Sequence, residues 1–185
     1  MDLKLYPEVV EEKRKEATLA DRVRSEFTPA ISFTEERKND VQRAVAGLNR
    51  DFSTQISGAN KTYGLPENLL VNLLAVESSG VEDAISPSGA RGLGQLMPET
   101  ARELGLRVDE EVDERADGSK NIDASAKYLA RLIKAADGDV GVALARYNYG
   151  YGNVSKYAED PTKVLPKETR DFGGLIMSYV EPAEE

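Results

Sequence analysis

A carboxylate on the apolar face of a helix most constrains what this chain can fold into. Residues 65–79 read LPENLLVNLLAVESS and predict a helix with Pro66 in its first position, where the missing N–H costs little. One face of that helix carries Leu70, Leu73, Leu74 and Glu77. The pattern therefore places Glu77 on the stripe that packs against the rest of the fold.

Burial would give Glu77 an unusual chemistry. Loss of water destabilises the charged carboxylate and raises its pKa, and the partial negative charge at the C-terminal end of a helix acts in the same direction. A carboxyl group that stays protonated near neutral pH can act as a general acid. The alternative is a frayed last turn in which Glu77 faces solvent.

The rest of the chain shows helical patterns and almost no alternating strand pattern. Apolar residues at helical spacing predict an amphipathic helix over residues 33–60, with Ser32 as its cap. Shorter helices are expected over residues 98–104, over 122–136 with Asn121 as its cap, over 139–148, and from Pro166 onward. We predict a mainly α fold in which residues 84–95 form a small hairpin-like loop.

A charged segment precedes this predicted core. Residues 11–15 read EEKRK, a mixed charge run typical of a solvated helix face, and Pro29 interrupts any long helix there. We therefore divide the chain into a helical N-terminal extension, residues 1–32, and one folded domain, residues 33–185. The N-terminus shows no apolar core of a secretory signal, so we expect either that a signal was removed and replaced by Met or that the protein reaches its target by another route.

The composition excludes several classes of function. The chain has no cysteine and no histidine, which excludes disulfides, thiolate catalysis, serine–histidine nucleophiles and the usual imidazole zinc sites. The net charge of −9 disfavours nucleic-acid binding, and no apolar run approaches the roughly 20 residues of a membrane span. Asp113 and Asp117 loosely resemble a calcium loop, but Arg115 stands where a third ligand belongs. We expect no metal and no cofactor.

Four segments of the chain, taken together, are typical of one family. They read ESSGVEDAISPSGARGLGQLMPETARELG at residues 77–105, NIDASAKYLARLI at 121–133, ALARYNYGYGNV at 143–154 and PKETRDF at 166–172. In this order they resemble the soluble lytic transglycosylase family. The resemblance covers roughly residues 58–180 and implies a goose-type-lysozyme-like fold with a cleft for a peptidoglycan strand.

The resemblance implies an activity that needs a single acid, Glu77. Members of the family cleave the bond between N-acetylmuramic acid and N-acetylglucosamine. The same carboxyl group first protonates the glycosidic oxygen and then takes the proton of the muramoyl C6 hydroxyl, which attacks C1. The expected product is a 1,6-anhydro sugar, and the internal hydroxyl replaces an activated water.

The resemblance also implies that six further residues bind the glycan. They are Ser86, Gln95, Met97, Tyr147, Asn148 and Glu168. Ser86 has the alternative role of a turn residue beside Pro87, and Met97 that of a plain core residue. Tyr147 is expected close to the catalytic glutamate, and Glu168 is read as positioning or structural. Gly94 departs from the family, which has Met there, so the local shape of the site is left open.

Two other functions stay open at this point. A goose-type muramidase would use water and need a second carboxylate, for which Asp83 and Glu99 lie nearest in the sequence. A structural or delivery protein of a virion or secretion machine would retain the fold only to bind glycan. The expected partners are a peptidoglycan strand and a larger virion or envelope assembly contacted through the N-terminal extension.

Overall fold

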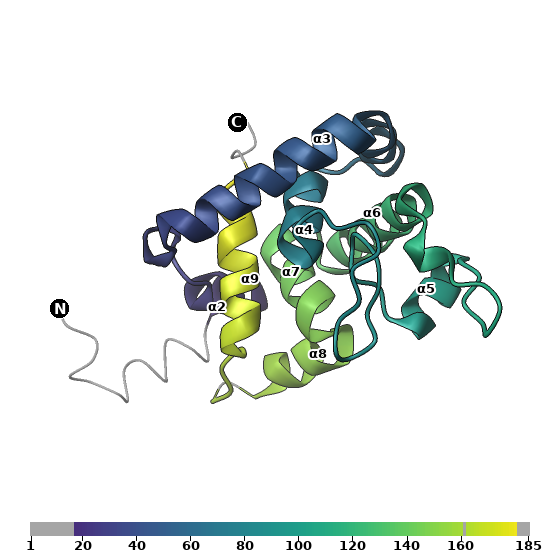
Figure 1. Cartoon of the computed structure of the whole chain (residues 1–185). Helices are drawn as coiled ribbons and strands as arrows, with labels where there is room; N and C mark the ends of the chain where they lie inside the picture. Colours follow the sequence, from purple (N-terminus) through teal and green to yellow (C-terminus); the bar gives the residue numbers. More distant parts are fainter. Residues whose placement is uncertain (1–16, 161, 181–185) are drawn as a thin grey trace. The chain divides into compact units, whose positions relative to one another are not determined.

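The structure, a computed structural model, describes residues 17–160 and 162–180, which form helices and only isolated β-bridges (Figure 1). The prediction of a mainly α fold is therefore confirmed. In chain order the helices are α2 (Leu19–Glu26), α3 (Glu35–Tyr63), α4 (Leu69–Ser78), α5 (Pro98–Leu104), α6 (Gly118–Ala135), α7 (Val140–Tyr149), α8 (Tyr151–Glu159) and α9 (Lys167–Met177), with short 3₁₀ turns η2 (Ala30–Ser32) and η3 (Glu114–Ala116). Within the described residues, no helix has the length and apolar character needed to cross a membrane.

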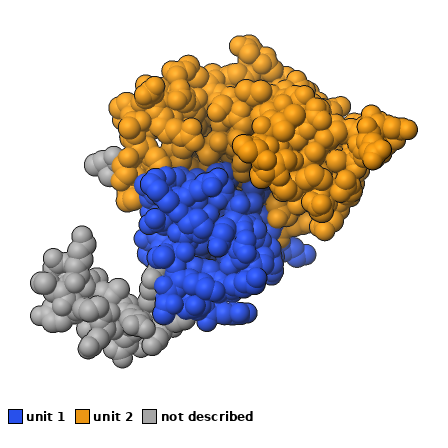
Figure 2. Space-filling view, turned by 60° about the horizontal axis from the view of Figure 1, so that its bottom comes forward, with its two compact units in different colours: residues 1–28, 132–174 blue, residues 29–131, 175–185 orange. Residues whose placement is uncertain are grey.

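The chain divides into two compact units, coloured separately in Figure 2. Unit 1 consists of residues 1–28 and 132–174, and unit 2 of residues 29–131 and 175–185. Unit 2 holds the helix that carries Glu77 and the loop that follows it. Unit 1 holds the segment with Tyr147 and Asn148.

In unit 2 the long helix α3 packs against α4. The predicted cap at Ser32 is wrong, because the side chain of Thr34 accepts the hydrogen bond from the N–H of Arg37 and the helix begins at Glu35. The predicted end is confirmed: α3 stops at Tyr63, and Gly64 takes the left-handed conformation (φ 62°) that a helix end of this kind requires. Phe52 interrupts the helical dihedrals and kinks the helix.

Helix α4 begins later than predicted. Pro66 is not its first residue but lies in a preceding turn, where its carbonyl accepts from the N–H of Leu69 at 3.2 Å. Asn68 then adopts a left-handed conformation (φ 60°) that Asn tolerates better than most residues. Every residue from Leu69 to Ala75 is buried, so α4 is covered on all sides and not along one stripe only.

The segment between α4 and α5 forms the hairpin-like loop that the sequence predicts. Isolated antiparallel bridges join Ile85 to Arg91 and Arg91 to Leu96. Helix α5 then runs over Pro98–Leu104 and is closed by Gly105 at φ 103°, as predicted. Residues 79–97 are called the active-site loop below.

Helix α6 contradicts the prediction that Asn121 is an N-cap. The helix begins at Gly118, four residues before the predicted start at Ile122, and the side chain of Asp117 accepts from the N–H of Lys120 at 3.0 Å. Asn121 lies inside the first turns and is fully buried. The next predicted start is confirmed, since Asp139 caps α7 by accepting from the N–H of Val142.

Unit 1 is built on an apolar cluster to which α2 contributes. The cluster consists of Val23, Val142, Ala145, Val154, Tyr157 and Leu165. Arg22, also on α2, donates to the carbonyls of Tyr157, Ala158 and Asp160 at the end of α8, at 3.0–3.2 Å. Helix α8 itself had no counterpart in the sequence prediction.

These contacts bear on the proposed boundary after residue 32. That boundary assigns α2 to the extension, whereas Val23 of α2 lies completely buried in the core of unit 1. The charge run EEKRK at residues 11–15 lies outside the described residues.

Candidate active site

Glu77 lies in the last turn of α4 and is half-buried. That turn is closed by hydrogen bonds: the N–H of Ser79 donates to the carbonyl of Ala75 at 3.0 Å, and the hydroxyl of Ser78 donates to Leu74 at 3.0 Å. Ser79 ends the helix in a left-handed conformation (φ 55°). The carboxylate is thus presented from an ordered helix end and not from a frayed one.

Ser86 lies in the active-site loop as a turn residue. Its hydroxyl accepts from the N–H of Ala90 at 3.0 Å and lies 2.9 Å from the hydroxyl of Ser88. These contacts match the alternative that the sequence left open, namely a serine that stabilises the turn after Pro87. The contact with substrate expected for Ser86 stays a prediction.

Gln95 and Met97 lie near the far end of the same loop. Gln95 adopts a left-handed backbone (φ 48°), and its side-chain Nε2 donates to the carbonyls of Ala84 at 3.0 Å and Gly92 at 2.9 Å. Met97 precedes α5 and is 39% exposed, so it is not a plain core residue. The amide nitrogen of Gln95 is therefore bonded within the loop, while Met97 is accessible to solvent.

A chain of ion pairs runs along one side of the loop. Arg91 binds both oxygens of Asp83, at 2.5 and 2.9 Å, and reaches Asp113 at 3.0 Å. Asp113 in turn pairs with Arg115 at 2.8 Å. The hydrogen bonds from Arg115, followed by those from Arg91, hold the pKa of Asp113 well below its usual range, although its partial burial acts in the opposite direction. Hydrogen bonding to Arg91 likewise lowers the pKa of Asp83.

The two aspartates of the loose calcium-like pattern have other partners in the structure. Asp113 is engaged by two guanidinium groups, and Asp117 caps α6. Among the residues that the structure describes, no three His, Cys, Asp or Glu side chains are grouped as a metal ion would require.

Two buried side chains hold the backbone of the active-site loop, and the sequence prediction missed both. Arg115 is 7% exposed, and its Nη1 donates to the carbonyls of Gly89 at 2.8 Å and Leu96 at 2.9 Å. Asn121 is 0% exposed; its Oδ1 accepts from the N–H of Gly94 at 2.7 Å. We call Arg115 and Asn121 the loop brace. Two features of the sequence could have indicated these roles. Arg115 lies within an acidic segment, and Asn121 is the first residue of the segment NIDASAKYLARLI.

The remaining predicted site residues belong to unit 1. Tyr147 and Asn148 occupy the last turn of α7 and are half-buried. The Oδ1 of Asn148 accepts from the hydroxyl of Thr169, which is buried in the first turn of α9, at 2.8 Å. Glu168, beside Thr169, is exposed. The structure therefore joins the Tyr–Asn and Glu–Thr motifs through Asn148 and Thr169.

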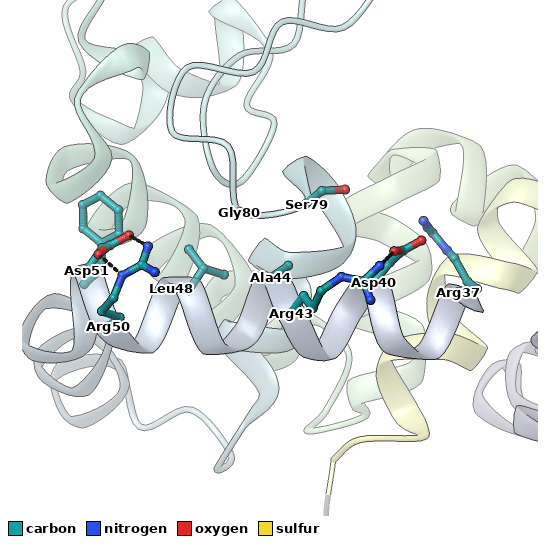
Figure 3. Close-up of a pocket in the computed structure, with 11 residues that line it drawn as sticks. Arg37, Asp40, Arg43, Ala44, Leu48, Arg50, Asp51, Ser79 and Gly80 are labelled. Carbon is teal, nitrogen blue, oxygen red and sulfur yellow. Dashed lines mark hydrogen bonds and ion pairs between the residues drawn. The ribbon is translucent and has the colours of Figure 1, made fainter. Parts of the chain in front are cut away.

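A surface cavity of about 390 Å³ lies next to the end of α4 (Figure 3). It is lined by α3 residues between Arg37 and Phe52 together with Ser79 and Gly80. Arg50 pairs with Asp51 at 2.7 Å in it, and Arg43 pairs with Asp40. None of the seven predicted site residues lines this cavity, so we do not place the glycan site there.

Comparison with known proteins shows which family this chain resembles. The family model of the transglycosylase SLT domain matches residues 54–169. The chain is 31% identical over 162 residues to membrane-bound lytic murein transglycosylase F 1 of Alkalilimnicola ehrlichii, covering 83% of this chain and 32% of that protein. It is 36% identical over 128 residues to peptidoglycan transglycosylase gp16 of Escherichia phage T7, covering 66% of this chain and 10% of that protein. The chain thus spans a third or less of the length of these two relatives.

Solved structures support the same assignment. An inactive glutamate-to-glutamine mutant of the lytic transglycosylase Slt from Pseudomonas aeruginosa superposes with a TM-score of 0.60 at 27% identity, covering 71% of this chain and 24% of that one. The 70 kDa soluble lytic transglycosylase of Escherichia coli, at 21% identity and the same TM-score, supports the fold alone. The predicted lysozyme-like fold and the family resemblance are confirmed, and the chain belongs to the transglycosylase SLT domain family.

Proposed function

We propose that this chain is a peptidoglycan lytic transglycosylase with Glu77 as its acid and base. The observation that carries the proposal is a half-buried carboxylate in the ordered last turn of α4, directly before the braced active-site loop. Glu77 gives its proton to the glycosidic oxygen, and the C1–O bond breaks so that N-acetylglucosamine leaves with a free hydroxyl. The C6 hydroxyl of the muramoyl residue then forms a bond to C1 and returns its proton to Glu77.

The position of Glu77 is compatible with this role. The residue lies in the last turn of α4 and is half-buried, so solvent reaches it only in part. The mechanism requires a carboxyl group that gives up a proton and takes one back, and we propose that Glu77 supplies it.

A hydrolase mechanism is less well supported, because neither candidate for a second carboxylate suits water activation. Both oxygens of Asp83 accept hydrogen bonds from Arg91, which lowers the basicity of that carboxylate. Glu99 is exposed in the first turn of α5. An internal hydroxyl needs no such base, because its effective concentration at C1 is already high.

The other predicted site residues take supporting roles in this proposal. The Nε2 of Gln95 is used within the loop, so its Oε1 is the atom that would accept a hydrogen bond from a sugar hydroxyl. The exposed side chain of Met97 would pack against an apolar sugar face. Ser86, Tyr147, Asn148 and Glu168 are proposed to contact or position the glycan.

Mass spectrometry of muropeptides released from purified sacculi tests the reaction. We expect ends of 1,6-anhydromuramic acid, lighter by one water than muramidase products and resistant to borohydride reduction. Reducible muramic-acid ends as the main product would instead establish a hydrolase. Binding of sacculi with no released product would favour a glycan-binding structural protein.

We also propose that the chain works within a larger virion or envelope assembly and docks through the charged part of its N-terminal extension that precedes α2 and includes residues 11–15. Two relatives from phages support this setting: gp16 of phage T7, and a protein of phage PRD1 named transglycosylase, 34% identical over 121 residues (64% of this chain and 43% of that one). A variant that lacks residues 1–16 should cleave soluble glycan strands normally but fail to enter the particle or envelope fraction. Deletion through residue 28 should also unfold unit 1, because it removes Val23 from the core. Normal recruitment without residues 1–16 would refute the docking role.

A further inference from the structure

The active-site loop is held from outside by the loop brace at four backbone groups. Arg115 binds the carbonyls of Gly89 and Leu96, while Asn121 binds the N–H of Gly94 and, through Nδ2, the carbonyl of Arg91 at 3.2 Å. The brace thus contacts both strands of the hairpin-like segment and the turn between Arg91 and Gln95. Its two members are six residues apart in the sequence and contact one another directly, because Asn121 also donates to the carbonyl of Arg115 at 2.9 Å.

Asn121 uses its whole amide in this arrangement. Both Nδ2 hydrogens are donated, to the carbonyls of Arg91 and Arg115, and Oδ1 accepts from Gly94 and from the hydroxyl of Ser125 at 3.3 Å. A fully buried amide with every donor and acceptor matched permits one arrangement of its partners, because any shift leaves a polar group unpaired.

The loop is pressed against this amide at Gly92. A Cβ added there would lie 2.1 Å from the Nδ2 of Asn121 and 2.2 Å from the carbonyl oxygen of Arg115, and the backbone has φ +86°. Only glycine fits, for both steric and conformational reasons. The turn therefore rests directly on the brace with no side chain between them.

The residues expected to meet the glycan follow immediately after this turn. Gln95 is adjacent to Gly94, and its side chain is tied to the carbonyl of Gly92. Met97 follows Leu96, whose carbonyl is held by Arg115. The brace therefore holds the backbone on either side of Gln95, at Gly94 and at Leu96.

We propose that Asn121 is a positioning residue of the transglycosylase reaction, which sets the geometry of Gln95 and Met97 through the backbone of Gly92 and Gly94. This inference rests on the proposed function. It differs from a purely structural role, in which loss of Asn121 would lower stability and leave the folded enzyme as active as before.

Steady-state kinetics of two variants on soluble glycan strands separate these roles. Asn121→Asp keeps the size and can accept from Gly94 but cannot donate to the two carbonyls, and Asn121→Ser removes the amide without adding charge. At a temperature where thermal melting shows both variants fully folded, we expect kcat/KM to fall at least about tenfold, mainly through a higher KM, with the pH profile of kcat unchanged. Unaltered kcat and KM in the folded variants would overturn the proposal.

Ser125→Ala is the matched control. It removes a bond to the same Oδ1 atom from within α6, and the bond that is lost involves no backbone group of the loop. We expect kcat and KM to stay within about twofold of the wild type. A loss as large as that of Asn121→Ser would show that general destabilisation of α6, and not loop geometry, is responsible, which refutes the proposal.

Hydrogen exchange of the wild-type protein gives a test that needs no variant and no substrate. The amide of Gly94 should exchange much more slowly than that of an unprotected loop residue, because it is bonded to buried Asn121. Rapid exchange at Gly94 would overturn the proposal even if neither Asn121 variant folds. The proposed function has a separate point of failure, the absence of 1,6-anhydro products from the wild-type enzyme.

Discussion

Helix α4 and the active-site loop are consecutive in the sequence but are held by different forces. The helix is surrounded by apolar contacts, with Leu69–Ala75 all buried, and makes its backbone hydrogen bonds internally. The loop has its backbone bonded to side chains from residues 115 and 121, which come much later in the chain. The acid is therefore placed by a local pattern, whereas the residues expected to bind the glycan are placed by a distant one.

The largest effect should come from Glu77→Gln, which tests whether the acid is separable from the packing of α4. The substitution is nearly isosteric and removes the proton that the mechanism needs. We expect glycan cleavage to fall at least about 10²-fold while the melting temperature stays close to that of the wild type. Near-normal activity in the folded variant would exclude Glu77 as the acid.

Leu73→Ala tests the apolar support of the helix. Leu73 is fully buried, so the change leaves a cavity and should lower the free energy of unfolding by about 2–5 kcal/mol. Chemical denaturation measures this loss. A cost below about 1 kcal/mol would mean that α4 is less tightly packed than its burial indicates.

Asp113→Asn tests the polar support of the loop and should depend on pH. The pKa of Asp113 is depressed in the folded protein, so its ion pairs stabilise fully above its ordinary value of 3.8 and are lost as pH falls through the lower, folded value. We therefore expect the variant to melt earlier than the wild type at pH 7 and the two curves to converge toward strongly acidic pH. An equal gap at every pH would exclude ionisation of Asp113 as the source of stability.

The smallest effect is expected from Tyr63→Phe, which removes a polar contact of the exposed surface in unit 2. The hydroxyl of Tyr63 lies 3.1 Å from each oxygen of exposed Asp123. Because solvent can replace this bond, the free energy of unfolding should change by no more than about 0.5 kcal/mol. A larger loss would mean that this exposed hydrogen bond contributes to stability as much as a buried one, which contradicts the comparison.

The difference between local patterns and contacts from distant segments explains which parts of the structure the sequence could predict. The helical type of α4, the end of α3 at Gly64 and the start of α7 at Asp139 follow from local periodicity and capping residues. The loop brace does not, because a hydrogen bond between Asn121 and Gly94 leaves no periodic trace in either segment. Asn before an apolar run is a common helix start, which is why the sequence predicts a cap at Asn121.

In unit 1, the sequence did not predict that α2 packs into the core, nor that α8 is a helix. The buried face of α2 consists of Arg22 and Val23 within a short, charged segment, so its apolar pattern is too weak to mark a core helix. Arg22 is buried because its guanidinium group donates to three carbonyls at the end of α8. This contact joins segments that lie far apart in the sequence. Helix α8 was missed because Gly150 and Gly152 at its start resemble a loop.

The left-handed backbone at Gln95 has a consequence for how this protein can be changed. A non-glycine residue in that conformation carries roughly 1–2 kcal/mol of strain, which glycine at the same position would relieve. Glycine would, however, give up the amide that reaches Ala84 and Gly92 and the oxygen proposed to face the glycan. Replacement of Gln95 by glycine would therefore relieve backbone strain and remove two hydrogen bonds of the loop at the same time, so stabilising changes are better sought outside residues 79–97.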